Sequence, residues 1–133
     1  MPRDSLLLLS RLLLAVLFVP SGFHALGDIA GTTGYFANLG LPLPMVAAWG
    51  TGLFELIAGL LVLIGFQTSV VALLFAAFCV AAGFIGHYGQ GGGDPTLSFM
   101  HSQMLMKDIA IAGGFLALAM AGGGAYAVDA RRS

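Results

Sequence analysis

Charged residues are scarce in this chain and make up only 8% of its 133 residues, whereas a typical soluble domain carries about 25%. Apolar residues make up 59% before glycine is counted. Since a helical crossing of a bilayer needs roughly 20 apolar residues, four crossings with short connections use the whole chain. Water is therefore not its main solvent, and no room remains for a soluble catalytic domain.

Other absences exclude further classes of protein. The chain has no Cys-x-x-Cys, no glycine-rich nucleotide loop after a strand and no Ser-His-Asp order in a suitable context, which disfavours a self-contained redox enzyme with its own nucleotide. With five basic residues and a net charge of -1, the sequence shows no basic patch of the kind that binds nucleic acid. The single cysteine, Cys79, is interpreted as a small buried hydrophobe and leaves the redox compartment undecided.

Four apolar runs predict an all-α, integral membrane bundle of four transmembrane helices, forming a single domain over residues 1–133. The helices are expected at about 5–26, 45–64, 69–86 and 103–122. Glycines and prolines in 27–44 and 87–102 predict loops there. A cleaved signal peptide at the first run is the alternative, and Phe23-His24-Ala25 is a poor cleavage site for it.

The basic residues predict the orientation of the bundle. Arg3, Arg11, Arg131 and Arg132 all lie near the termini, and the first and third loops contain no Lys or Arg. Basic residues close to membrane ends are retained in the cytoplasm. We therefore expect both termini in the cytoplasm and the loops 27–44 and 87–102 outside.

Glu55 is the sharpest signal, because it lies near the middle of the second helix, where a charge costs at least ~2.5 kcal/mol. Gly52 and Gly59 flank it and place it on a packing face. Arg11 is its expected partner, at an estimated height difference of about 7.5 Å. Together they are predicted to form a buried polar centre. An ion pair, a proton-accepting or ligand-binding carboxylate, and a protonated spectator remain open alternatives.

A second candidate site is predicted at the outer face, where titratable side chains gather. Its residues are His24, His87, His101, Lys107 and Asp108. Imidazoles there can anchor a helix at the interface, relay protons or donate to a quinone carbonyl. The nearby methionines 100, 104 and 106 suit Cu(I) only weakly, so no metal site is predicted. In the fourth helix, Ala110 and Gly114 suggest a further contact face.

Several short motifs follow one another along the chain. They are Leu9-Ser10-Arg11-Leu12-Leu13, Gly22-Phe23-His24, Gly40-Leu41-Pro42, Glu55-Leu56-Ile57-Ala58-Gly59, Lys107-Asp108 with the following Ile109 to Gly114, and Asp129. In the order and spacing of these motifs the chain resembles the DoxX family over roughly residues 5–130. Family members often carry Lys where this chain has Ala25.

The resemblance implies a four-helix bundle in the bacterial inner membrane, associated with thiosulfate:quinone oxidoreductase and with membrane complexes that handle thiol stress. We therefore expect a subunit of, or accessory to, a quinone-linked oxidoreductase complex. Catalytic residues stay undefined, no cofactor is intrinsic, and a quinone is the expected ligand. The expected partners are the bilayer and either another protein or a second copy. The alternative is a non-enzymatic scaffold or anchor, or a small-molecule permeation protein.

Overall fold

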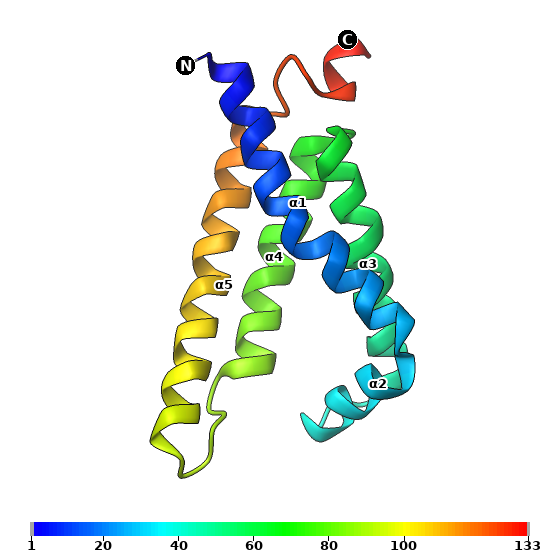
Figure 1. Cartoon of the computed structure of the whole chain (residues 1–133). Coiled ribbons are helices and arrows are strands. Elements are labelled where there is room, and N and C mark those ends of the chain that lie inside the picture. The colour runs from blue at the N-terminus through cyan, green and yellow to red at the C-terminus, as the bar shows by residue number, and fades with distance from the viewer. Residues whose placement is uncertain (1, 133) are drawn as a thin grey trace.

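The computed structural model describes residues 2–132 and contains only helices and connecting segments in that range (Figure 1). The elements are α1 (Arg3–Gly27), α2 (Ile29–Asn38), α3 (Pro44–Ile64), α4 (Thr68–His87), α5 (Pro95–Ala121) and a short 3-10 helix (Val128–Arg131). The helices α1, α3, α4 and α5 are each long and apolar enough to cross a membrane. The predicted all-α membrane bundle is therefore confirmed.

Both segments that were predicted as outer loops contain helical residues, although their glycines and prolines favoured loops. Within 27–44, the Asp28 side chain accepts a hydrogen bond from the Gly31 N–H at 3.0 Å and caps α2. Within 87–102, Asp94 accepts from the N–H of Thr96 at 2.9 Å and starts α5. Helix α5 therefore begins eight residues before position 103, at Pro95. Acidic N-caps satisfy the free N–H groups of a first turn, so the loop predictions were wrong over these residues.

The four long helices form two closely packed pairs, α1 with α3 and α4 with α5, and each pair touches the other much less. Figure 1 shows the pairs meeting at the end that carries both termini and diverging toward the end that carries α2. The α2 helix packs on α3 in the diverging half. The two pairs therefore lie farthest apart at the end that carries α2.

Small residues permit the close crossing of α1 and α3. A Cβ atom at Gly22 would lie 2.5 Å from the Leu56 backbone nitrogen, and one at Gly59 would lie 2.9 Å from Val19 Cγ2. Gly52 likewise faces Leu26. Membrane helices associate through such contacts. The predicted packing face around Glu55 is therefore occupied by α1.

Ala110 and Gly114 are both exposed, and a Cβ atom at Gly114 would lie 3.9 Å from Leu14 Cδ2 of α1. The contact face expected there lies mostly on the outside of this bundle, so a contact with another chain stays a prediction. Helices α4 and α5 instead approach at Gly83, where a Cβ atom would lie 3.0 Å from Asp108 Cβ. The lack of a side chain at Gly83 brings the Asp108 carboxyl close to α4. Gly83 thus determines how closely the Asp108 side chain approaches α4.

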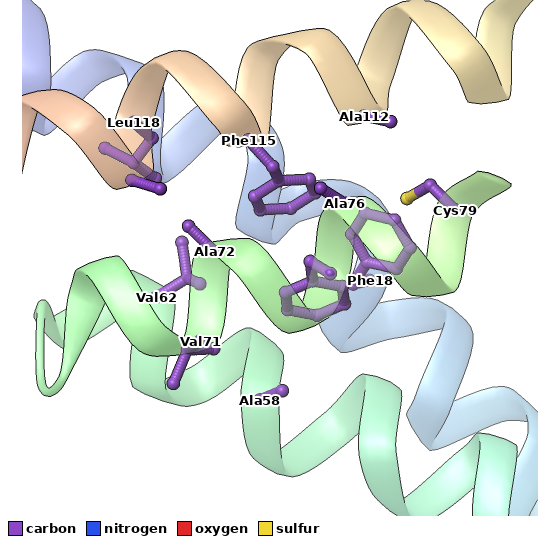
Figure 2. Packing of buried hydrophobic residues seen from close by; sticks show 12 residues of the cluster. Phe18, Ala58, Val62, Val71, Ala72, Ala76, Cys79, Ala112, Phe115 and Leu118 are labelled. Carbon is purple, nitrogen blue, oxygen red and sulfur yellow. The ribbon is translucent and has the colours of Figure 1, made fainter.

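An aromatic and aliphatic core joins the two pairs (Figure 2). The Phe75 and Phe115 rings stack with centroids 4.6 Å apart, and Phe18 from α1 lies 4.5 Å from Phe75. Aromatic rings in offset or tilted contact stabilise a core beyond the contribution of the apolar area that they bury. Phe18 and Cys79 belong to this core and also line the cavity described below, so the core closes one end of that cavity.

Candidate functional site

A cavity of about 500 Å³ lies between the two helix pairs, with walls that are mostly apolar. All five α-helices contribute to it. Its polar lining consists of Ser21, Tyr35, Thr51, Glu55, Cys79, His87 and Asp108. An apolar cavity with a few convergent polar groups is the usual form of a small-molecule site.

Glu55 reaches this cavity from the middle of α3 and is only 9% exposed. Thr51 lies one helical turn before it on the same face and lines the same cavity. Ser21 of α1 lies on the cavity wall as well. The Glu55 carboxyl group therefore lies beside a few polar groups in an otherwise apolar cavity. An ionisable side chain in such a place costs free energy in a membrane, and residues of this kind usually belong to functional sites.

The second carboxyl group of the cavity belongs to Asp108 and lies beside two histidines. The Nε2 atom of His87 is 3.8 Å from Asp108 Oδ2. On the opposite side of the His87 ring, Nδ1 lies 2.9 Å from the Nδ1 of His101. One of these two nitrogens must carry the proton while the other accepts it. The structure thus brings together three of the five predicted outer-face residues.

Tyr35 on α2 lines the cavity, and its hydroxyl group reaches α4. Its hydroxyl oxygen lies where a side chain at Gly86 would make contact, 3.2 Å from the position of a Cβ atom there. Partial burial, and secondarily the charge of Asp108, raises the pKa of the Tyr35 hydroxyl above its ordinary value. The phenol therefore remains a neutral hydrogen-bond donor across the physiological pH range.

Arg11 is fully buried, as expected, but it does not pair with Glu55. Its guanidinium group donates to the backbone carbonyls of Leu63 at 2.6 Å, Tyr126 at 3.1 Å, Gly123 at 3.2 Å and Val62 at 3.4 Å. Val62 lies seven residues after Glu55, about 10 Å farther along α3. The predicted ion pair is wrong, because free carbonyls at the end of α3 and in the C-terminal segment attract the cation instead.

The C-terminal segment is fixed at the same end of the bundle by Asp129. Its carboxylate accepts from the N–H groups of Gln67 at 2.7 Å and Thr68 at 2.8 Å. Burial alone would raise the pKa of Asp129, but these hydrogen bonds and nearby Arg132 outweigh it and hold the pKa below its ordinary value. Arg11 and Asp129 thus tie the segment after α5 to the turn between α3 and α4.

Of the predicted site residues, two more lie outside the cavity and make none of the contacts described above. His24 is exposed on α1 and is not part of the cavity lining. Lys107 is also exposed and borders a separate surface hollow with Phe99, Met100, Gln103 and Met104. Among residues 2–132, no group of three or more His, Cys, Asp or Glu side chains could hold a metal ion.

Several lining residues were not among the predicted site residues. Thr51 could have been found from its spacing of four residues before Glu55, which places both on one helix face. Ser21 and Cys79 carry no such signal, because their place depends on how α1 and α4 cross the bundle. Cys79 is buried as expected, but it also borders the cavity.

Comparison with known proteins fits this architecture. The DoxX family model matches residues 6–88. The chain belongs to the DoxX family. It is 35% identical to the inner membrane protein YphA of Escherichia coli K12, over 97% of this chain and 91% of that protein. It is 36% identical to the inner membrane protein YqjF of the same organism, over 96% of this chain and 92% of that protein.

A shorter similarity extends to Bacillus subtilis 168. The "Putative oxidoreductase CatD" of that organism is 35% identical to this DoxX protein over 56% of this chain and 54% of CatD. No solved structure matches the chain. The two relatives that cover nearly the whole chain are both named as inner membrane proteins, in agreement with its four apolar helices.

Proposed function

We propose that this DoxX protein is the quinone-binding membrane subunit of an oxidoreductase complex. The observation that carries the proposal is the cavity that holds Glu55, Asp108, His87 and Tyr35 between apolar walls. Its volume of about 500 Å³ falls within the range of small-molecule sites, roughly 300–1,000 Å³. The name of the partly similar Bacillus subtilis protein, "Putative oxidoreductase CatD", adds support.

A quinone matches the chemistry of this cavity at both ends. Its ring and isoprenoid chain are apolar and suit walls that include Leu17, Phe36 and Phe78. Its two oxygens accept hydrogen bonds, which the Tyr35 hydroxyl and the histidine of the cavity can donate. Reduction to the quinol takes up two electrons and two protons. The electrons would come from a reduced cofactor on a partner subunit, which is oxidised in the same step.

Photo-crosslinking tests whether the quinone occupies this cavity. Membranes that contain the full chain are illuminated with an azido-quinone, and the labelled residues are identified by mass spectrometry. We expect labelling within 78–87 of α4 or at Tyr35, and we expect excess unlabelled quinone to suppress it. Labelling confined to the lipid-facing side of α5, or labelling that excess quinone does not suppress, would remove the support for this function and favour a scaffold role.

We further propose that both termini face the cytoplasm, which places α2 and the loop between α4 and α5 on the outer side. The four terminal arginines support this orientation. In a Cys79→Ala background, Gly92→Cys should react with an impermeant thiol reagent added outside intact cells. Ala130→Cys should react only after the membrane is opened. The reverse labelling pattern would invert the orientation.

A further inference from the structure

His87 connects two parts of the molecule through its two ring nitrogens. Its Nδ1 faces His101 at 2.9 Å, and its Nε2 faces Asp108 at 3.8 Å. His87 ends α4, and His101 lies in the second turn of α5, so both border the loop that joins these helices. Asp108, two turns farther along α5, lines the cavity. The order from the loop inward is His101, His87, Asp108.

We infer that His101, His87 and Asp108 form a proton relay from the water beyond the α4–α5 loop into the cavity. The inference rests on the proposed quinone function and specifies how the site obtains its protons. An imidazole suits this role because it can accept a proton at one nitrogen and release one from the other. The 3.8 Å step is longer than a hydrogen bond, as catalytic contacts often are before a substrate binds.

Each transfer in the relay can be written with its bonds. The Asp108 O–H bond breaks and an O–H bond forms on a quinone oxygen. His87 then gives its Nε2 proton to the Asp108 carboxylate and takes a proton at Nδ1 from His101, which takes one from a hydronium ion in the water outside. The His87 ring then turns over, so that a protonated nitrogen faces Asp108 again before the next transfer. Two such cycles deliver two protons, and the partner's reduced cofactor delivers two electrons, so that quinone becomes quinol.

The other titratable groups that face the cavity offer no equivalent route. They are Tyr35 from α2, Glu55 from α3 and Cys79 from α4, while α1 supplies only Ser21. Tyr35 keeps its proton, because burial and Asp108 raise its pKa. Within the described residues, no hydrogen bond or ion pair joins Glu55 or Cys79 to another titratable side chain. Glu55 is therefore left to hydrogen-bond the ligand rather than to exchange protons with water.

Infrared spectroscopy of the full chain in lipid nanodiscs tests the relay without a redox partner. Spectra are recorded between about pH 5 and pH 8, the range in which histidine side chains generally change charge. The carboxyl band of Asp108 is identified as the band that Asp108→Asn lacks. After transfer to heavy water, the band shifts as its proton exchanges. We expect His101→Ala and His87→Ala to slow this exchange at least tenfold, since a positioned proton donor typically contributes about 10²–10⁴-fold.

Chemical rescue separates a relay from a structural role. Added imidazole should restore fast exchange in His101→Ala, whereas His24→Ala, which removes an exposed histidine outside the cavity, should exchange like the wild type. Unchanged exchange in both relay variants, slowing that imidazole does not rescue, or the absence of any protonated Asp108 band would each overturn the relay. Quinone binding by His101→Ala is measured in parallel, so a failure of the proposed function is recognised separately.

Discussion

Replacing Arg11 by leucine should lower the free energy of unfolding in detergent by at least about 3 kcal/mol. The guanidinium donates to four backbone carbonyls and is fully buried. A hydrogen bond to a charged group contributes about 1.5–3 kcal/mol, and a buried acceptor left without a donor costs about 1–3 kcal/mol. Arg11→Lys should lose most of this stability too, because an ammonium group lacks the planar fork that reaches several acceptors.

Arg3→Leu is the matched control for this change, because Arg3 lies on the same helix and makes one exposed hydrogen bond, to the Ala121 carbonyl at 2.8 Å. Its effect should stay near the few tenths of a kcal/mol that are typical of surface positions, at most about 0.5 kcal/mol. Thermal unfolding of the purified variants measures both. A loss in Arg11→Leu no larger than in Arg3→Leu would contradict the anchoring role of Arg11.

The same variants test the separation of Arg11 from Glu55. Groups that lie more than about 7–10 Å apart and share no partner usually have additive effects, within about 0.5 kcal/mol. The double change Arg11→Leu with Glu55→Leu should therefore cost the sum of the single changes. A coupling well above that limit would restore the ion pair that the sequence suggested.

The buried polar residues could be predicted from the sequence, but their partners could not. A charge in the middle of an apolar helix is costly wherever the helix packs, so Glu55 and Arg11 stand out without a structure. The pairing depended on assumed heights and overlooked backbone groups. The Gly123 and Tyr126 carbonyls that bind Arg11 have no sequence signature, because any residue carries a carbonyl and only the path of the C-terminal segment brings these two near.

The four long helices could be predicted from composition, whereas the helical residues within 27–44 and 87–102 could not. Asp28 and Asp94 are ordinary N-cap residues, yet the glycines after Asp28 and before Asp94 favoured loops. Helix α2 packs on α3, and that contact outweighs the low helix propensity of its glycines. Because α2 carries Tyr35, the sequence alone could not place this side chain on the cavity wall.

Filling the cavity should weaken quinone binding more than tenfold. Ala82 lines the cavity, so phenylalanine at this position would occupy space that the ligand needs, without altering Glu55, Asp108 or His87. A tenfold loss of affinity corresponds to about 1.4 kcal/mol, and Glu55→Leu should cost at least as much by removing a buried hydrogen-bonding group. Ala77→Phe is the matched control, because Ala77 lies on the same helix and is exposed.

The most direct measurement is the dissociation constant of a short-chain quinone for the full chain in nanodiscs, determined for the wild type, Ala82→Phe, Glu55→Leu and Ala77→Phe. Thermal unfolding of each variant verifies that it is folded. We expect saturable binding by the wild type and Ala77→Phe, and affinity reduced more than tenfold in folded Ala82→Phe and Glu55→Leu. Equal affinity in all four proteins, or no saturable binding by the wild type, would contradict the assignment of this cavity as a quinone site.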